Sequence, residues 1–66
     1  MFAGINMDDI KDYAYPTMMA ENALKKLHLG VINGDMDGAR REAYAAVQWM
    51  LEVIDCLRVM DAKAKG

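Results

Sequence analysis

Residues 33–60 of the chain read NGDMDGARREAYAAVQWMLEVIDCLRVM, and this stretch decides the fold. Its first three residues, Asn33, Gly34 and Asp35, separate two helical segments. Asn and Gly adopt the left-handed conformation that ends a helix, and Asp is a preferred N-cap of the next helix. We therefore expect one helix to end before Asn33 and a longer one to run over residues 36–62.

The predicted helix over residues 36–62 is apolar around most of its circumference. At about 100° per residue, its polar residues gather on one narrow strip, while apolar side chains cover an arc of roughly 200°. A surface helix of an ordinary globular domain needs an apolar stripe of only about 100°, so one companion helix cannot cover this arc. We expect the interface residues on the arc, namely Tyr44, Val47, Trp49, Met50, Val53, Ile54, Leu57 and Met60.

Upstream of the turn, a Tyr-Pro dipeptide at residues 15–16 marks a second boundary. The residue before a proline is pushed away from helical conformation, and proline itself is tolerated in a first helical turn. The sequence therefore predicts an acidic N-terminal arm over residues 1–15, in which Asp8 caps at most a short helical turn. A helical hairpin follows over residues 16–66, and its first helix spans residues 16–32.

The predicted first helix carries one apolar stripe. Apolar residues recur there at spacings of three and four, which is the pattern of a helix with one buried face. The stripe consists of Ala20, Ala23, Leu24, Leu27 and Val31. The predicted fold class is therefore all-α, a two-helix antiparallel hairpin with a short N-terminal arm.

The size of the chain limits how it can be stabilised. With 66 residues, of which 55% are hydrophobic and 27% charged, it is one small domain rather than a disordered segment. Domains of this size usually gain stability from disulfides, a metal or self-association. Cys56 is the only cysteine, and Cys56 and His28 alone cannot supply the four ligands of a closed zinc site. Self-association or a partner protein remains.

Two arrangements would cover the wide apolar arc. Either the N-terminal arm folds back over it, or a second copy of the hairpin packs against it. Two hairpins that dimerise form a four-helix bundle, in which both faces of each long helix are buried. The sequence favours this homodimer.

The sequence offers little for catalysis or metal binding. Serine is absent, and no nucleophile has a base at a useful spacing. Residues 33–38 have the spacing that begins an EF-hand calcium loop, but Tyr44 stands where a bidentate carboxylate is required, and Arg40 and Arg41 lie close by. We therefore expect no catalytic residues, no cofactor and no metal, and the chain is predicted not to be an enzyme.

The turn and the helix after it contain a glycine-aspartate turn followed by small and aliphatic residues, namely Gly34, Asp35, Asp37, Ala39, Ala43, Ala46 and Val47. At these spacings they resemble the turn and second helix of a tetratricopeptide repeat. Upstream positions of that family do not align, and there is no second repeat, whereas several are normally needed for a stable array. We interpret the resemblance as convergence on a favourable hairpin turn, and it implies antiparallel packing of two helices.

Two functions fit such a chain. The first is a small helical protein that acts in protein–protein interaction as a homo-oligomer. The second is an inhibitor or modulator that binds and blocks a larger target protein, because aromatic side chains often dominate interfaces. The candidate anchors for the second function are Phe2, Tyr13, Tyr15, Tyr44 and Trp49.

A helix-turn-helix nucleic-acid binder is a third alternative. Lys25 and Lys26 precede the turn, and Arg40 and Arg41 follow it, but the net charge of −2 and the apolar second helix disfavour nucleic acid as a partner. The N-terminal residues have no basic region or long apolar run, so we expect no signal peptide and no membrane partner. With the lone cysteine, this favours a cytoplasmic location.

Overall fold

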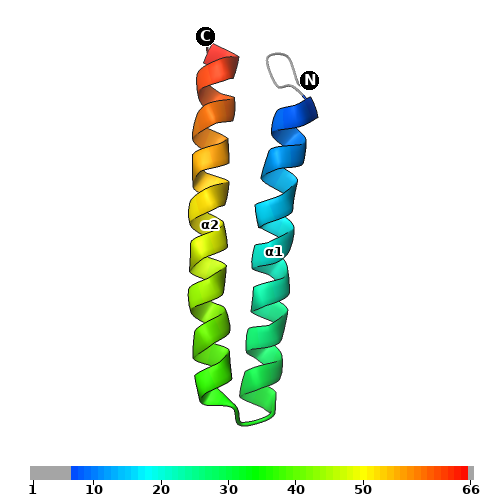
Figure 1. Cartoon of the computed structure of the whole chain (residues 1–66), viewed down its shortest axis with the longest axis vertical. Helices are drawn as coiled ribbons and strands as arrows, with labels where there is room; N and C mark the ends of the chain where they lie inside the picture. Colours follow the sequence, from blue (N-terminus) through cyan, green and yellow to red (C-terminus); the bar gives the residue numbers. More distant parts are fainter. Residues whose placement is uncertain (1–6, 66) are drawn as a thin grey trace.

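The computed structural model describes residues 7–65, and over that range it consists of two antiparallel helices joined by a short turn (Figure 1). Helix α1 spans Met7–Ile32 and helix α2 spans Met36–Lys65. They pack side by side as a rod of 48 × 16 × 15 Å. The predicted all-α antiparallel hairpin is therefore confirmed.

The turn satisfies the backbone groups at the ends of both helices. The amide of Asp35 donates to the carbonyl of Gly30 at 2.7 Å. The amide of Gly34 donates to the carbonyl of Val31 at 3.1 Å, which completes a Schellman motif. Gly34 has a φ of 77°, the left-handed conformation that this motif needs. At the start of α2, the amide of Gly38 donates to the Asp35 carboxylate at 2.9 Å, so Asp35 is the N-cap that the sequence predicted.

Helix α1 begins at Met7 rather than at Pro16, so the predicted start of the first helix was wrong. A proline inside a helix donates no hydrogen bond and leaves the carbonyl four residues earlier without its helical partner. That carbonyl belongs to Asp12, and the thiol of Cys56 on α2 donates to it at 3.7 Å. The contact with α2 thus supplies a donor in place of the missing helical hydrogen bond, and the helix continues through Pro16. The remainder of the predicted arm, residues 1–6, lies outside the described residues.

The contact between the helices is a seam of mostly small side chains. The buried residues of this first seam are Asp9, Pro16, Ala20 and Ala23 on α1 and Ala39, Ala46 and Val53 on α2. Most of them stand seven residues apart, which is the repeat of a coiled-coil seam. The approach is close beside the turn, where a Cβ on Gly30 would lie 3.1 Å from the backbone nitrogen of Ala39. Small residues therefore bring the two helices close together.

The first seam buries little apolar surface. Four of the five buried hydrophobic residues are alanines, and the fifth is Val53. On α1, Ala20 and Ala23 are buried as predicted, whereas Leu24 and Val31 are each 48% exposed. The expectation that the whole stripe is buried was therefore wrong. Alanines lie closest to α2, and the longer side chains are left at the edges of the contact.

Candidate functional site

An apolar groove runs along one face of the hairpin, between α1 and α2. Its volume is about 410 Å³ and its lining is almost entirely apolar. The groove forms because Ala43 and Ala46 are small, while larger side chains of both helices line the space beside them. The lining residues are Leu24, Leu27, Ala43, Ala46, Val47, Met50, Leu51 and Ile54.

The large side chains of the apolar groove are about half exposed. The exposed fraction is 55% for Val47, 52% for Leu51 and 42% for Ile54. Leu57 lies about one turn beyond Ile54 and is also exposed, so it extends the patch toward the open end of the hairpin. Single exposed apolar residues are normal, but a contiguous patch of them marks a contact site.

On α2, four exposed apolar residues and the half-buried Ala43 follow a repeat of their own. The members of this second seam, separated alternately by four and three residues, are Ala43, Val47, Met50, Ile54 and Leu57. Val47 directly follows Ala46 of the first seam, so the second seam is rotated by about 100° around the helix. Alternate spacings of four and three are the pattern with which one helix packs against another. Helix α2 therefore has two seams with the spacing of helix packing, and α1 occupies the first.

The structure divides the eight predicted interface residues between the two surfaces of α2. Five of them are exposed, namely Tyr44, Val47, Met50, Ile54 and Leu57. The other three lie on the side of the helix that packs against α1, where Val53 is buried and Trp49 and Met60 are half-buried. The sequence pattern does not separate these groups, because both fall within one apolar arc.

The apolar groove also contains residues that the sequence prediction did not include. Leu24 and Leu27 of α1 line it, and so does Leu51 of α2. The signal that points to them is the small size of Ala20 and Ala23, which lie at the same contact. When alanines form the closest approach between two helices, the neighbouring leucines lie at the margin.

The opposite face of the hairpin has a mixed lining. Tyr15 and Trp49 make an edge-to-face contact there, with ring centroids 5.6 Å apart and planes inclined at 81°. A hollow of about 270 Å³ beside Trp49 is lined by polar as well as apolar residues, among them Asn22, Lys26 and Glu42. Trp49 therefore packs within the chain and does not line the apolar groove.

An ion pair joins the two helices at the open end of the hairpin. The ammonium group of Lys63 donates a hydrogen bond of 2.8 Å to Oδ1 of Asp9, whose side chain is only 8% exposed. This hydrogen bond and the charge of Asp9 raise the pKa of Lys63 above its ordinary value of 10.5. Oδ2 of Asp9 is buried without a hydrogen-bond partner among the described residues. The pair fixes the start of α1 against the end of α2.

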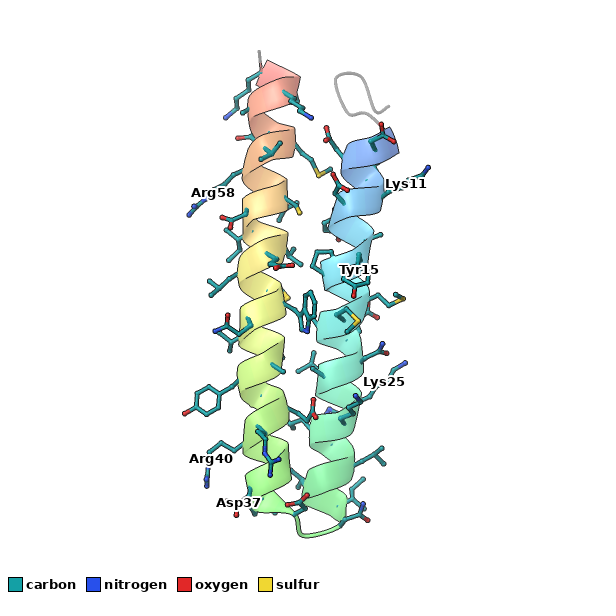
Figure 2. The ribbon with its side chains drawn as sticks, in the orientation of Figure 1. Lys11, Tyr15, Lys25, Asp37, Arg40 and Arg58 are labelled. Carbon is teal, nitrogen blue, oxygen red and sulfur yellow. The ribbon has the colours of Figure 1, made fainter. Side chains whose placement is uncertain are left out.

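The basic residues beside the turn extend in different directions. Arg40 pairs with Asp37 at 3.3 Å on the surface of α2, and Lys25 extends from the other side of the hairpin (Figure 2). Within residues 7–65, no three His, Cys, Asp or Glu side chains are grouped closely enough to hold a metal ion. Neither described helix is long and apolar enough to cross a membrane.

Comparisons of the chain with protein-family models, with curated proteins and with solved structures find no match. The candidate site is therefore argued from its geometry alone. By volume, apolar character and regular spacing, the apolar groove with the second seam is the strongest candidate in the described part of the chain.

Proposed function

We propose that the chain is a small non-enzymatic protein that acts in protein–protein interaction as a homo-oligomer, with the apolar groove as the contact surface. The observation that carries this proposal is the exposed second seam of α2. Two hairpins packed groove to groove form a four-helix bundle, in which the first seam is buried within each chain and the second between chains. The proposal retains a cytoplasmic location, which the single cysteine favours.

Burial of the apolar groove also supplies stability that the first seam lacks. Complete burial of a leucine, isoleucine, valine or methionine side chain stabilises a protein by about 1.5–3 kcal/mol, so burial of its exposed half contributes about 1 kcal/mol. Several such side chains line each groove, and both copies contribute them. For a hairpin whose core is four alanines and Val53, this is a large addition.

A charge placed in the second seam tests the proposal. Val47→Glu puts a carboxylate into the contact, and because Val47 is exposed in the hairpin, the helices themselves should form. We expect dimerisation to weaken about a hundredfold, because an unpaired charge is costly to bury. Sedimentation equilibrium measures the association, and circular dichroism checks the helix content.

The matched control is Gln48→Glu, which adds the same charge at the next residue, on the mainly polar strip of α2. Its dimerisation should stay within a few-fold of the wild-type value. Equal association of the two variants and the wild type would contradict the assignment of the contact to the apolar groove. A wild-type chain that is monomeric at every concentration would contradict the homo-oligomer and favour a different protein as the partner.

A further inference from the structure

The second seam of α2 ends in charges of opposite sign. The residue three positions before Ala43 is Arg40, and the residue four positions after Leu57 is Asp61, so both continue the spacing of the seam. Both side chains are exposed, 65% for Arg40 and 63% for Asp61. Arg40 and Asp61 lie at equal distances from the middle of α2, which falls between Met50 and Leu51. The seam is therefore apolar at its centre, with an arginine at one end and an aspartate at the other.

We propose that two copies of the chain pair antiparallel along α2, with a two-fold axis beside Met50 and with the two turns at opposite ends of the dimer. This inference rests on the proposed function and adds the orientation of the copies to it. In this arrangement, Arg40 of each copy lies beside Asp61 of the second copy. Val47 lies beside Ile54 of the second copy. A two-fold axis repeats every contact, so one opposite-charge pair closes each end of the interface.

The neighbours of these charges extend the complementarity. Arg40 pairs with Asp37 at 3.3 Å, and Asp61 pairs with Lys65 at 3.1 Å, both along the surface of α2. In the antiparallel pairing, the Arg40–Asp37 pair of one copy lies beside the Asp61–Lys65 pair of the second copy. Opposite charges then meet at both positions, because Arg40 lies beside Asp61 and Asp37 lies beside Lys65. Such an arrangement steers two copies into one orientation, although each exposed pair adds little affinity.

A parallel pairing of the two α2 helices brings like charges together, because Arg40 then faces Arg40 and Asp61 faces Asp61. Repulsion between these charges disfavours that orientation.

Charge reversal distinguishes the orientations. Arg40→Glu and Asp61→Arg should each weaken dimerisation about tenfold at low salt, because each replaces two attractions with two repulsions. The double variant R40E/D61R should recover the wild-type dissociation constant, since the signs are exchanged and opposite charges meet again. The control is Lys11→Glu, a charge reversal on an α1 side chain that extends away from α2 (Figure 2), and it should leave dimerisation unchanged.

Cysteine cross-linking supplies an independent measurement. In a Cys56→Ser background, Leu51→Cys should form a disulfide-linked dimer, because the two copies of residue 51 meet beside the two-fold axis. Arg40→Cys alone should form none, whereas a mixture of the Arg40→Cys and Asp61→Cys chains should form a mixed dimer.

The outcomes separate the orientation from the proposed function. A dimer in which Arg40→Cys links to itself, or in which the double reversal binds no better than the single variants, would overturn the antiparallel pairing and leave a homo-oligomer in place. Monomeric wild-type chain at all concentrations would overturn both.

Discussion

At the scale of single residues, Pro16 and Cys56 form a compensating pair across the hairpin. Pro16 leaves the carbonyl of Asp12 without its helical donor, and the Cys56 thiol donates to that carbonyl. The cysteine is thus a hydrogen-bond donor in a half-buried position as well as a small apolar residue. The hydrogen bond of Cys56 should therefore stabilise the folded chain only when Pro16 leaves the Asp12 carbonyl without a helical donor.

A double-mutant cycle tests this dependence. Cys56→Val should lower the free energy of unfolding by about 1 kcal/mol more in the wild type than in a Pro16→Ala background, where the residue 16 amide again bonds to Asp12. Urea unfolding followed by Trp49 fluorescence at fixed chain concentration measures both differences. Cys56→Ser is the matched control, because it keeps a donor. Equal costs in the two backgrounds would contradict the compensation.

The second prediction at this scale concerns the turn. Gly34→Ala should lower the free energy of unfolding by about 1–2 kcal/mol, because an L-residue with a Cβ is strained at the φ of 77°. Gly34→Asn should cost less, since asparagine tolerates this conformation better than alanine. Thermal unfolding at one concentration gives the comparison, and an alanine variant as stable as the asparagine variant would count against the account.

Residues at the turn were predictable because their chemistry is local. The left-handed conformation of Gly34 and the capping by Asp35 depend on neighbours within a few positions, so the sequence alone indicates them. The start of α1 was not predictable in this way. The helix continues through Pro16 beside a contact with α2, in which Cys56 donates to the carbonyl of Asp12, 44 residues earlier in the chain.

At the scale of the helices, the Asp9–Lys63 pair should make the open end sensitive to alkaline pH. Because Asp9 raises the pKa of Lys63 above 10.5, the contribution of Lys63 to stability is fully present below pH 10.5. It is lost as the pH rises through the higher pKa of the folded state. Stability of the wild type should therefore fall in that range.

The measurement is the difference in unfolding free energy between the wild type and Lys63→Met, followed from neutral pH to beyond 10.5. The difference should be largest at neutral pH and should shrink as Lys63 loses its proton. Lys26→Met, on an exposed lysine of α1, controls for the loss of one charge. A difference that stays constant through the alkaline range would show that the ion pair does not link pH to stability.

The two helices were predictable as elements, but the division of their surfaces was not. Hydrophobic spacing indicates that α2 has an apolar arc, and it gives no reason why Val53 is buried against α1 while Ile54 remains exposed. That choice depends on the register between the helices, which close contacts such as that of Gly30 with Ala39 fix. The apolar groove is therefore a property of two helices together.

At the scale of the whole molecule, the hairpin is a long rod with a thin core. Its first seam brings the helices together through alanines, and its larger apolar side chains line the apolar groove on one face. A rod of this kind gains little from its own interior and much from a second rod packed alongside. The wide apolar arc seen in the sequence has its physical basis here, because a single companion helix covers only the first seam.

Sedimentation equilibrium of the wild-type chain across a dilution series measures whether the hairpin associates with itself. We expect the mass of two chains at high concentration and a shift toward one chain on dilution. The thermal midpoint should fall in parallel, because association stabilises the folded state by mass action. A folded single chain at every concentration, with a thermal midpoint independent of concentration, would rule out the homodimer.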